Sequence, residues 1–159
     1  MCHPHHSIRL LAAFAALSLA AHRAEAQAVA VRPIQNLSFG FLLPGVATTI
    51  DAAQLSRSGQ IEVSAAIGTT FQIRFTLPAA MSGAGTTLPL TFGNNSAGVA
   101  AASNPANLIR FNPNATTRFQ MVTTTRATFF LGGQARPRAG QPVGSYSAPV
   151  VVTIINLGI

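Results

Sequence analysis

The chain has 159 residues, a formal net charge of +7 and only three acidic residues. Its single cysteine excludes an intrachain disulfide, and its hydrophobic content of 48 % is too high for a disordered protein. The length corresponds to one ordinary domain.

The first 26 residues have the layout of a secretory signal peptide. An apolar run of 12 residues, Leu10–Ala21, precedes small residues at Ala24 and Ala26, which fit a cleavage site before Gln27. A helix of that length rises about 18 Å and is shorter than a bilayer core of about 30 Å. We therefore expect a signal peptide helix that is removed, and a retained membrane anchor is the alternative.

Removal of this segment would leave residues 27–159 as a single domain with little reactive chemistry. Cys2 and all four histidines lie before the cleavage site, and the chain has no lysine. The remaining domain keeps eight arginines and two acids, Asp51 and Glu62. We expect it to be exported to the periplasm, the cell surface or the medium, with membrane contact only through the transient signal peptide.

Beyond the signal peptide, short apolar runs alternate with turn-forming residues, a pattern typical of all-β proteins. The clearest strand is "TFQIRFTLP", in which Phe71, Ile73 and Phe75 share one face and Pro78 ends the strand. Further strands are expected within residues 28–34, 45–51, 60–68, 86–92, 108–111, 118–131 and 145–157. Seven to nine strands in an immunoglobulin-like, pilin-like β-sandwich would account for this pattern.

The pairing of residues 60–66 with residues 70–77 has two solutions. A tight hairpin centred on Gly68 would place Glu62 opposite Arg74, where the two charges would attract each other. Alternatively, the two strands lie in opposite sheets of the sandwich and do not pair. Periodicity alone does not distinguish these arrangements.

The closing segment "GSYSAPVVVTIINLGI" is apolar on both faces of the expected strand. One face carries Tyr146, Val150, Val152 and Ile154, and the other carries Val151, Ile155 and Leu157. Pro149 interrupts the ladder, so pairing should be firmest from Val150 onward. Because a strand that covers only one face would not need the second apolar set, we expect an interior strand whose second face or edge is covered.

No combination of residues in the expected domain supports catalysis. Serines and threonines are plentiful, but no histidine or lysine is present to activate them. Asp51 and Glu62 are the only carboxylates, so we expect a turn residue and a strand residue rather than a catalytic pair or a metal site. The arginines are scattered along the sequence, which does not favour nucleic-acid binding. We expect no enzyme activity, no catalytic residue, no cofactor and no metal.

Three stretches, taken in order, resemble a known family. They are "IQNLSFGFLLPG", "GQIEVSAAIGTTFQIRFTLPAAMSG" and "GSYSAPVVVTI", and together they span most of residues 32–156. This order resembles the bacterial domain of unknown function 4402 family and, more distantly, spore coat protein U domains and the pilins of archaic chaperone–usher pathways. The chain departs from the coat protein U relatives in having no cysteine in the expected domain, and it ends on "NLGI" where such chains tend to stop near an aromatic residue.

The resemblance implies an exported β-sandwich with no known enzymatic activity. For the pilin relatives it also implies subunits that lack a final strand, which the N-terminal extension of a neighbouring subunit supplies. Partners would then be other surface subunits and a periplasmic chaperone. Here Val29, Val31 and Ile34 would belong to the donated segment, and Tyr146, Val150, Val152 and Ile154 to the accepting terminal strand.

A second functional hypothesis is a self-contained secreted binding domain for an envelope glycan or polymer. Binding would then be carried by two loops, the Asn- and Gly-rich residues 93–107 and the "QARPRAG" segment at residues 134–140. The lack of tryptophan and the presence of a single tyrosine leave few platforms on which a sugar could stack.

Overall fold

The structure is a computed structural model, and it describes residues 28–101 and 104–158. The expected signal peptide, including Ala24, Ala26 and Gln27, lies outside the described residues. The described part contains twelve strands and one 3-10 helix. They are β1 (Ala30–Gln35), β2 (Thr48–Ile50), β3 (Gly59–Ser64), β4 (Thr70–Thr76), β5 (Ala80–Gly83), β6 (Thr86–Thr91), β7 (Ala97–Ala101), η1 (Pro105–Asn107), β8 (Ile109–Phe111), β9 (Thr117–Gln120), β10 (Arg126–Leu131), β11 (Gly133–Ala135) and β12 (Val151–Gly158).

The prediction of an all-β protein is confirmed, but the expected count of seven to nine strands is too low. The strands form three antiparallel sheets, in the orders β1-β3-β10-β7-β8, β2-β11-β6-β5 and β12-β4-β9. The strands that were not expected are β5, β7 and β11, each of three to five residues. In the described residues no helix is long and apolar enough to cross a membrane.

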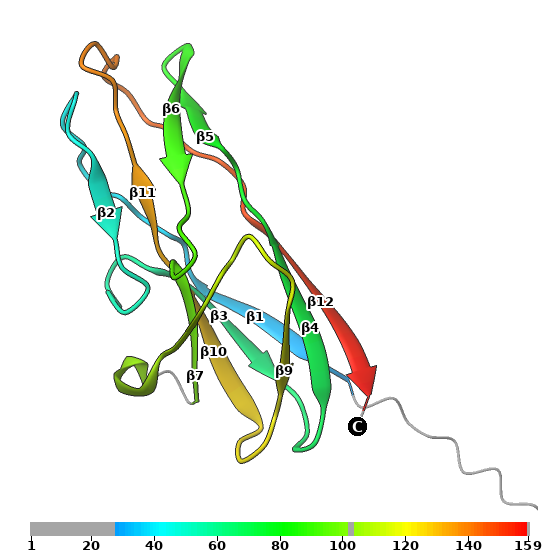
Figure 1. The fold of residues 1–159 in the computed structure, drawn as a ribbon. Helices are drawn as coiled ribbons and strands as arrows, with labels where there is room; N and C mark the ends of the chain where they lie inside the picture. The colour runs from blue at the N-terminus through cyan, green and yellow to red at the C-terminus, as the bar shows by residue number, and fades with distance from the viewer. Residues whose placement is uncertain (1–27, 102–103, 159) are drawn as a thin grey trace, which may run out of the picture.

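The five-stranded and three-stranded sheets face each other and enclose the main core (Figure 1). Phe71 of β4 and Phe119 of β9 contact Phe129 of β10, with ring centroids 6.0 and 5.0 Å apart. Phe111 of β8 and Phe75 of β4 extend this aromatic cluster, their centroids 6.1 Å apart. These contacts join strands of both layers, so the structure is a β-sandwich.

The structure decides the open question of strand pairing. β4 pairs with β12 and β9, whereas β3 pairs with β1 and β10 in the other layer. The hairpin that would bring Glu62 opposite Arg74 is therefore absent, and Glu62 lies opposite Arg32 instead. The strict alternation of β4 is confirmed, because Phe71 and Ile73 are fully buried while Arg74 is exposed.

The prediction that residues 93–107 form a loop is wrong for the middle of that segment. Ala97–Ala101 is β7, an interior strand between β10 and β8, and its first four residues are buried. Small residues are needed there, because a Cβ atom on Gly98 would lie 2.5 Å from Cγ of Leu108. The alanine- and glycine-rich composition of β7, which is also typical of loops, is therefore explained by the close packing of the chain over the outer face of the sheet.

The four-stranded sheet forms the other end of the molecule around a second, smaller core (Figure 1). Phe39, Ile50, Leu88 and Leu90 are buried there. The chain enters this sheet directly from β10, because Gly132 alone separates β10 from β11. The two cores are therefore connected by a nearly continuous strand.

Candidate functional site

One side of the sandwich is bordered by two edge strands, β1 and β12. β1 is the first strand of the five-stranded sheet, and β12 is the first strand of the three-stranded sheet. β4 and β9 pack over β10. β12 pairs with the other edge of β4 and therefore lies on the side of β3 and β1. We call the region between β1 and β12 the open side.

Side chains that point inward are partly uncovered at the open side. Val31 of β1 lies directly opposite Val63 of β3 and therefore shares its face of the sheet. Val63 is fully buried, whereas Val31 is 47 % exposed. The inner face of β1 thus lacks the covering strand that buries its neighbour.

β12 is an edge strand, so the expectation of an interior strand is wrong within the described chain. Val152 and Ile154 pair with Phe75 and Ile73 and are half-buried against the main core. Val151 and Ile155, on the opposite face, are 53 % and 52 % exposed. The strand begins at Val151, as Pro149 predicted, but no described residue pairs with its second edge.

The open side continues into an apolar hollow of about 620 Å³ at the other end of the molecule. Its walls are two irregular segments, residues 37–44, which follow β1, and residues 141–146, which lead toward β12. Met81 and Leu88 contribute to the lining from the four-stranded sheet. The hollow is therefore bordered by the chain segments that continue from the two strands of the open side.

The hollow is uncharged and has an apolar rim. Its lining includes no acidic or basic residue, and the hydroxyl of Tyr146 already donates to the carbonyl oxygen of Pro142 at 2.7 Å. Phe41 and Val143 are almost completely exposed beside it, and Leu43 is 67 % exposed. The surface of the hollow is therefore mainly apolar and uncharged.

The residues expected to form the site are brought together only in part. Val29, Val31 and Ile34 lie on or next to β1, which pairs with β3 of the same chain. Val152 and Ile154 of β12, and Val150 just before it, pack against the main core, while Tyr146 lies outside β12 and lines the hollow. Sequence reasoning missed the hollow, although the uncharged run "FGFLLPG" was a signal of apolar surface.

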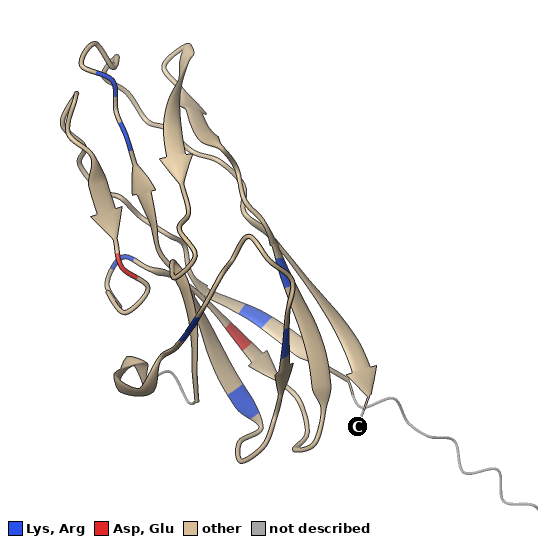
Figure 2. Cartoon of the chain, in the orientation of Figure 1, with Lys and Arg blue, Asp and Glu red and all other residues tan. Residues whose placement is uncertain are grey.

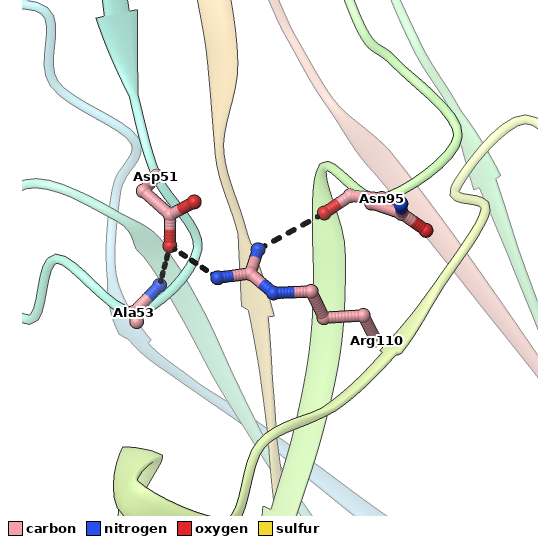
Figure 3. A network of polar contacts seen from close by, with 4 residues as sticks. All are labelled: Asp51, Ala53, Asn95 and Arg110. Atoms are coloured by element: carbon pink, nitrogen blue, oxygen red, sulfur yellow. Dashed lines mark hydrogen bonds and ion pairs between the residues drawn. The ribbon is translucent and has the colours of Figure 1, made fainter.

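A polar network joins the turn after β2 to β8, the strand at the other end of the five-stranded sheet from β1 (Figure 3). Asp51, in the turn after β2, accepts hydrogen bonds from Arg110 of β8 at 2.8 Å and from the backbone N–H of Ala53 at 2.8 Å. Arg110 also donates to the carbonyl oxygen of Asn95 at 3.2 Å. The bond from Arg110 holds the pKa of Asp51 below its ordinary value.

Replacement of Asp51 by asparagine is expected to lower the free energy of unfolding by less than about 1 kcal/mol, because both partners are largely exposed. Since the folded pKa is lowered, the stabilisation is present above the ordinary aspartate pKa and disappears as the pH falls through the folded value. The difference between the wild type and Asp51→Asn should therefore shrink as the pH falls below the ordinary aspartate pKa. Urea unfolding at a series of pH values measures it, and a difference that grows with acid would contradict this assignment.

The remaining charges do not gather into a catalytic or metal-binding group. In the described residues no three His, Cys, Asp or Glu side chains come together. Glu62 lies on β3 and Asp51 is bound to Arg110, so the two carboxylates are separate and differently placed. The arginines are spread over both ends of the molecule (Figure 2).

Comparison with models of known protein families gives no match, and neither does comparison with curated proteins.

Proposed function

We propose that this protein is a non-enzymatic, exported structural or adhesive subunit that assembles by strand addition at the open side. In this proposal it is a pilin-like member of the family that its sequence resembles. The observation that carries the proposal is the free edge of β12 beside an inward-facing but half-exposed Val31. A strand added to β12 would extend the three-stranded sheet over the inward-facing side chains that the open side leaves half-exposed.

The occupant we propose is the N-terminal segment of a neighbouring subunit, residues 27–34. In the single chain, the part of this segment from Ala30 onward lies in β1, and five of the six residues of β1 are exposed. Its release would uncover little buried surface but would break its ladder with β3, and in the assembly the segment would pair with the β12 edge of the next subunit. A periplasmic chaperone would protect the same edge before assembly.

Replacement of Val31 by aspartate should prevent assembly while leaving the isolated subunit folded. Val31 is 47 % exposed in the single chain, but in the donated segment it would face the core of the next subunit, where the new charge would be buried without a partner at a cost of several kcal/mol. Self-association should weaken by at least about 100-fold, because 2.7 kcal/mol corresponds to that factor. Sedimentation velocity over a range of concentrations measures the effect.

The matched control is Val122→Asp, which adds the same charge at a 66 % exposed valine in the turn between β9 and β10. This variant should associate like the wild type. A wild type that stays monomeric at every concentration, or a Val31→Asp variant that associates normally, would rule out strand addition at the open side.

A further inference from the structure

The outer face of the three-stranded sheet combines a row of cations with a row of apolar side chains. In the register of this sheet, Ile155 of β12 lies opposite Gln72 of β4, which lies opposite Arg118 of β9. Two residues further along β4, Arg74 lies opposite Thr153 of β12. These side chains point away from the core, because they alternate with the buried Phe71, Ile73 and Phe75.

Arg74 and Arg118 are free to bind an external anion. Both are exposed, and neither side chain makes an ion pair or a hydrogen bond with any described residue. They are diagonal neighbours across the β4–β9 pair, where Cα atoms lie about 7–8 Å apart. Two guanidinium groups at that spacing can reach one phosphate together.

No acidic residue of the described chain balances this pair. Asp51 is engaged by Arg110, and Glu62 lies on the other sheet opposite Arg32. A second copy of the chain therefore offers almost no negative charge to this face. The complementary partner has to supply anions from outside the protein.

The apolar row specifies the partner further. Val151 and Ile155 are each about half exposed on β12, next to the arginines, and Leu157 follows at 45 % exposed. No aromatic side chain lies on this face of the three strands, so the bases of a nucleic acid would find nothing to stack on. An anionic lipid surface, in contrast, presents phosphate groups directly next to hydrocarbon.

We infer that the outer face of β12, β4 and β9 binds an anionic lipid surface, with Arg74 and Arg118 on headgroup phosphates and Val151 and Ile155 against the acyl boundary. This inference does not rest on strand addition, which uses the edge of β12 and the inner face of β1. It assigns a role to the second apolar face of the last strand.

The test is flotation of the purified protein with vesicles. Vesicles of equimolar phosphatidylcholine and phosphatidylglycerol should bind the protein, and vesicles of phosphatidylcholine alone should not. Because each arginine near an anionic surface strengthens binding about fivefold, the double variant Arg74→Gln/Arg118→Gln should bind about 30-fold more weakly. The double variant Val151→Ser/Ile155→Ser should bind at least about fivefold more weakly.

The matched control is Arg136→Gln/Arg138→Gln, which removes the same charge from the connection after β11, at the other end of the molecule (Figure 2). It should bind within about threefold of the wild type. Equal losses in the two arginine double variants would overturn the inference, because attraction would then depend on net charge alone. Binding to polyglutamate without binding to the anionic vesicles would overturn it as well.

Val31→Asp keeps the two proposals distinguishable. This variant should bind the anionic vesicles like the wild type even though it no longer assembles. A Val31→Asp variant that loses vesicle binding together with assembly would show that the lipid face does not act on its own, and would contradict the inference.

Discussion

Replacement of Phe129 by alanine is expected to lower the free energy of unfolding by about 3–5 kcal/mol. Phe129 is 1 % exposed and lies at the centre of the aromatic cluster, with its ring edge-on to Phe71, Phe111 and Phe119. Truncation removes these contacts from both layers at once and leaves a cavity that stiff neighbouring strands cannot fill. Because a domain of this size is stabilised by about 5–15 kcal/mol, the variant should be close to unfolding at ambient temperature.

Urea denaturation of the purified protein measures this effect, and Ile109→Ala is the control. Ile109 is 69 % exposed on β8, so its truncation should change the stability by less than about 0.5 kcal/mol. Equal stabilities of the two variants would show that the sheets do not pack around Phe129.

Replacement of Gly132 by alanine should destabilise the fold by about 3 kcal/mol, although it adds a single methyl group. The new Cβ would lie 2.2 Å from the carbonyl oxygen of Ile50 and 2.8 Å from the backbone nitrogen of Ala52. Both atoms belong to backbone, so β2 or β10 has to move. That movement would also strain the hydrogen bond from Gly132 N–H to the carbonyl oxygen of Ser96, now 2.7 Å long.

Thermal unfolding followed by circular dichroism compares this variant with Gly140→Ala, whose new Cβ would meet nothing within 4 Å. The control should unfold at the wild-type midpoint or slightly above it, because alanine restricts the unfolded chain. A Gly132→Ala variant as stable as Gly140→Ala would contradict the close approach of β2 to the junction between β10 and β11.

The alternation of apolar and polar residues in the sequence predicted the strands of the main core well. It predicted poorly the strands that consist of small residues. In β4, large apolar residues alternate strictly with polar ones, and both the strand and its buried face are confirmed. In β7 this alternation is missing. The strand lies between β10 and β8, and the chain packs over its outer face, so alanine and glycine are the residues that fit there. Their composition is the same as that of a loop, so only the tertiary environment identifies them as a strand.

The open side could not be predicted from the sequence, because it depends on segments that are distant in the chain. Residues 37–44 and residues 141–146 are about a hundred positions apart, and each alone reads as an irregular connection. For β12, two apolar faces favoured an interior strand, since apolar side chains are normally buried. The topology places it at an edge instead, and this exposure is the reason to propose an external partner for its edge and another for its outer face.

Hydrogen exchange along β12 tests the proposed strand addition most directly. No described strand pairs with the outer edge of β12, so in the single subunit the outward-pointing amides between Val151 and Ile155 should exchange within seconds. Under conditions in which the wild type assembles, these alternate amides should become protected, and in Val31→Asp they should stay unprotected. Protection that appears elsewhere on assembly, with the outward amides of β12 still exchanging fast, would contradict strand addition at this edge.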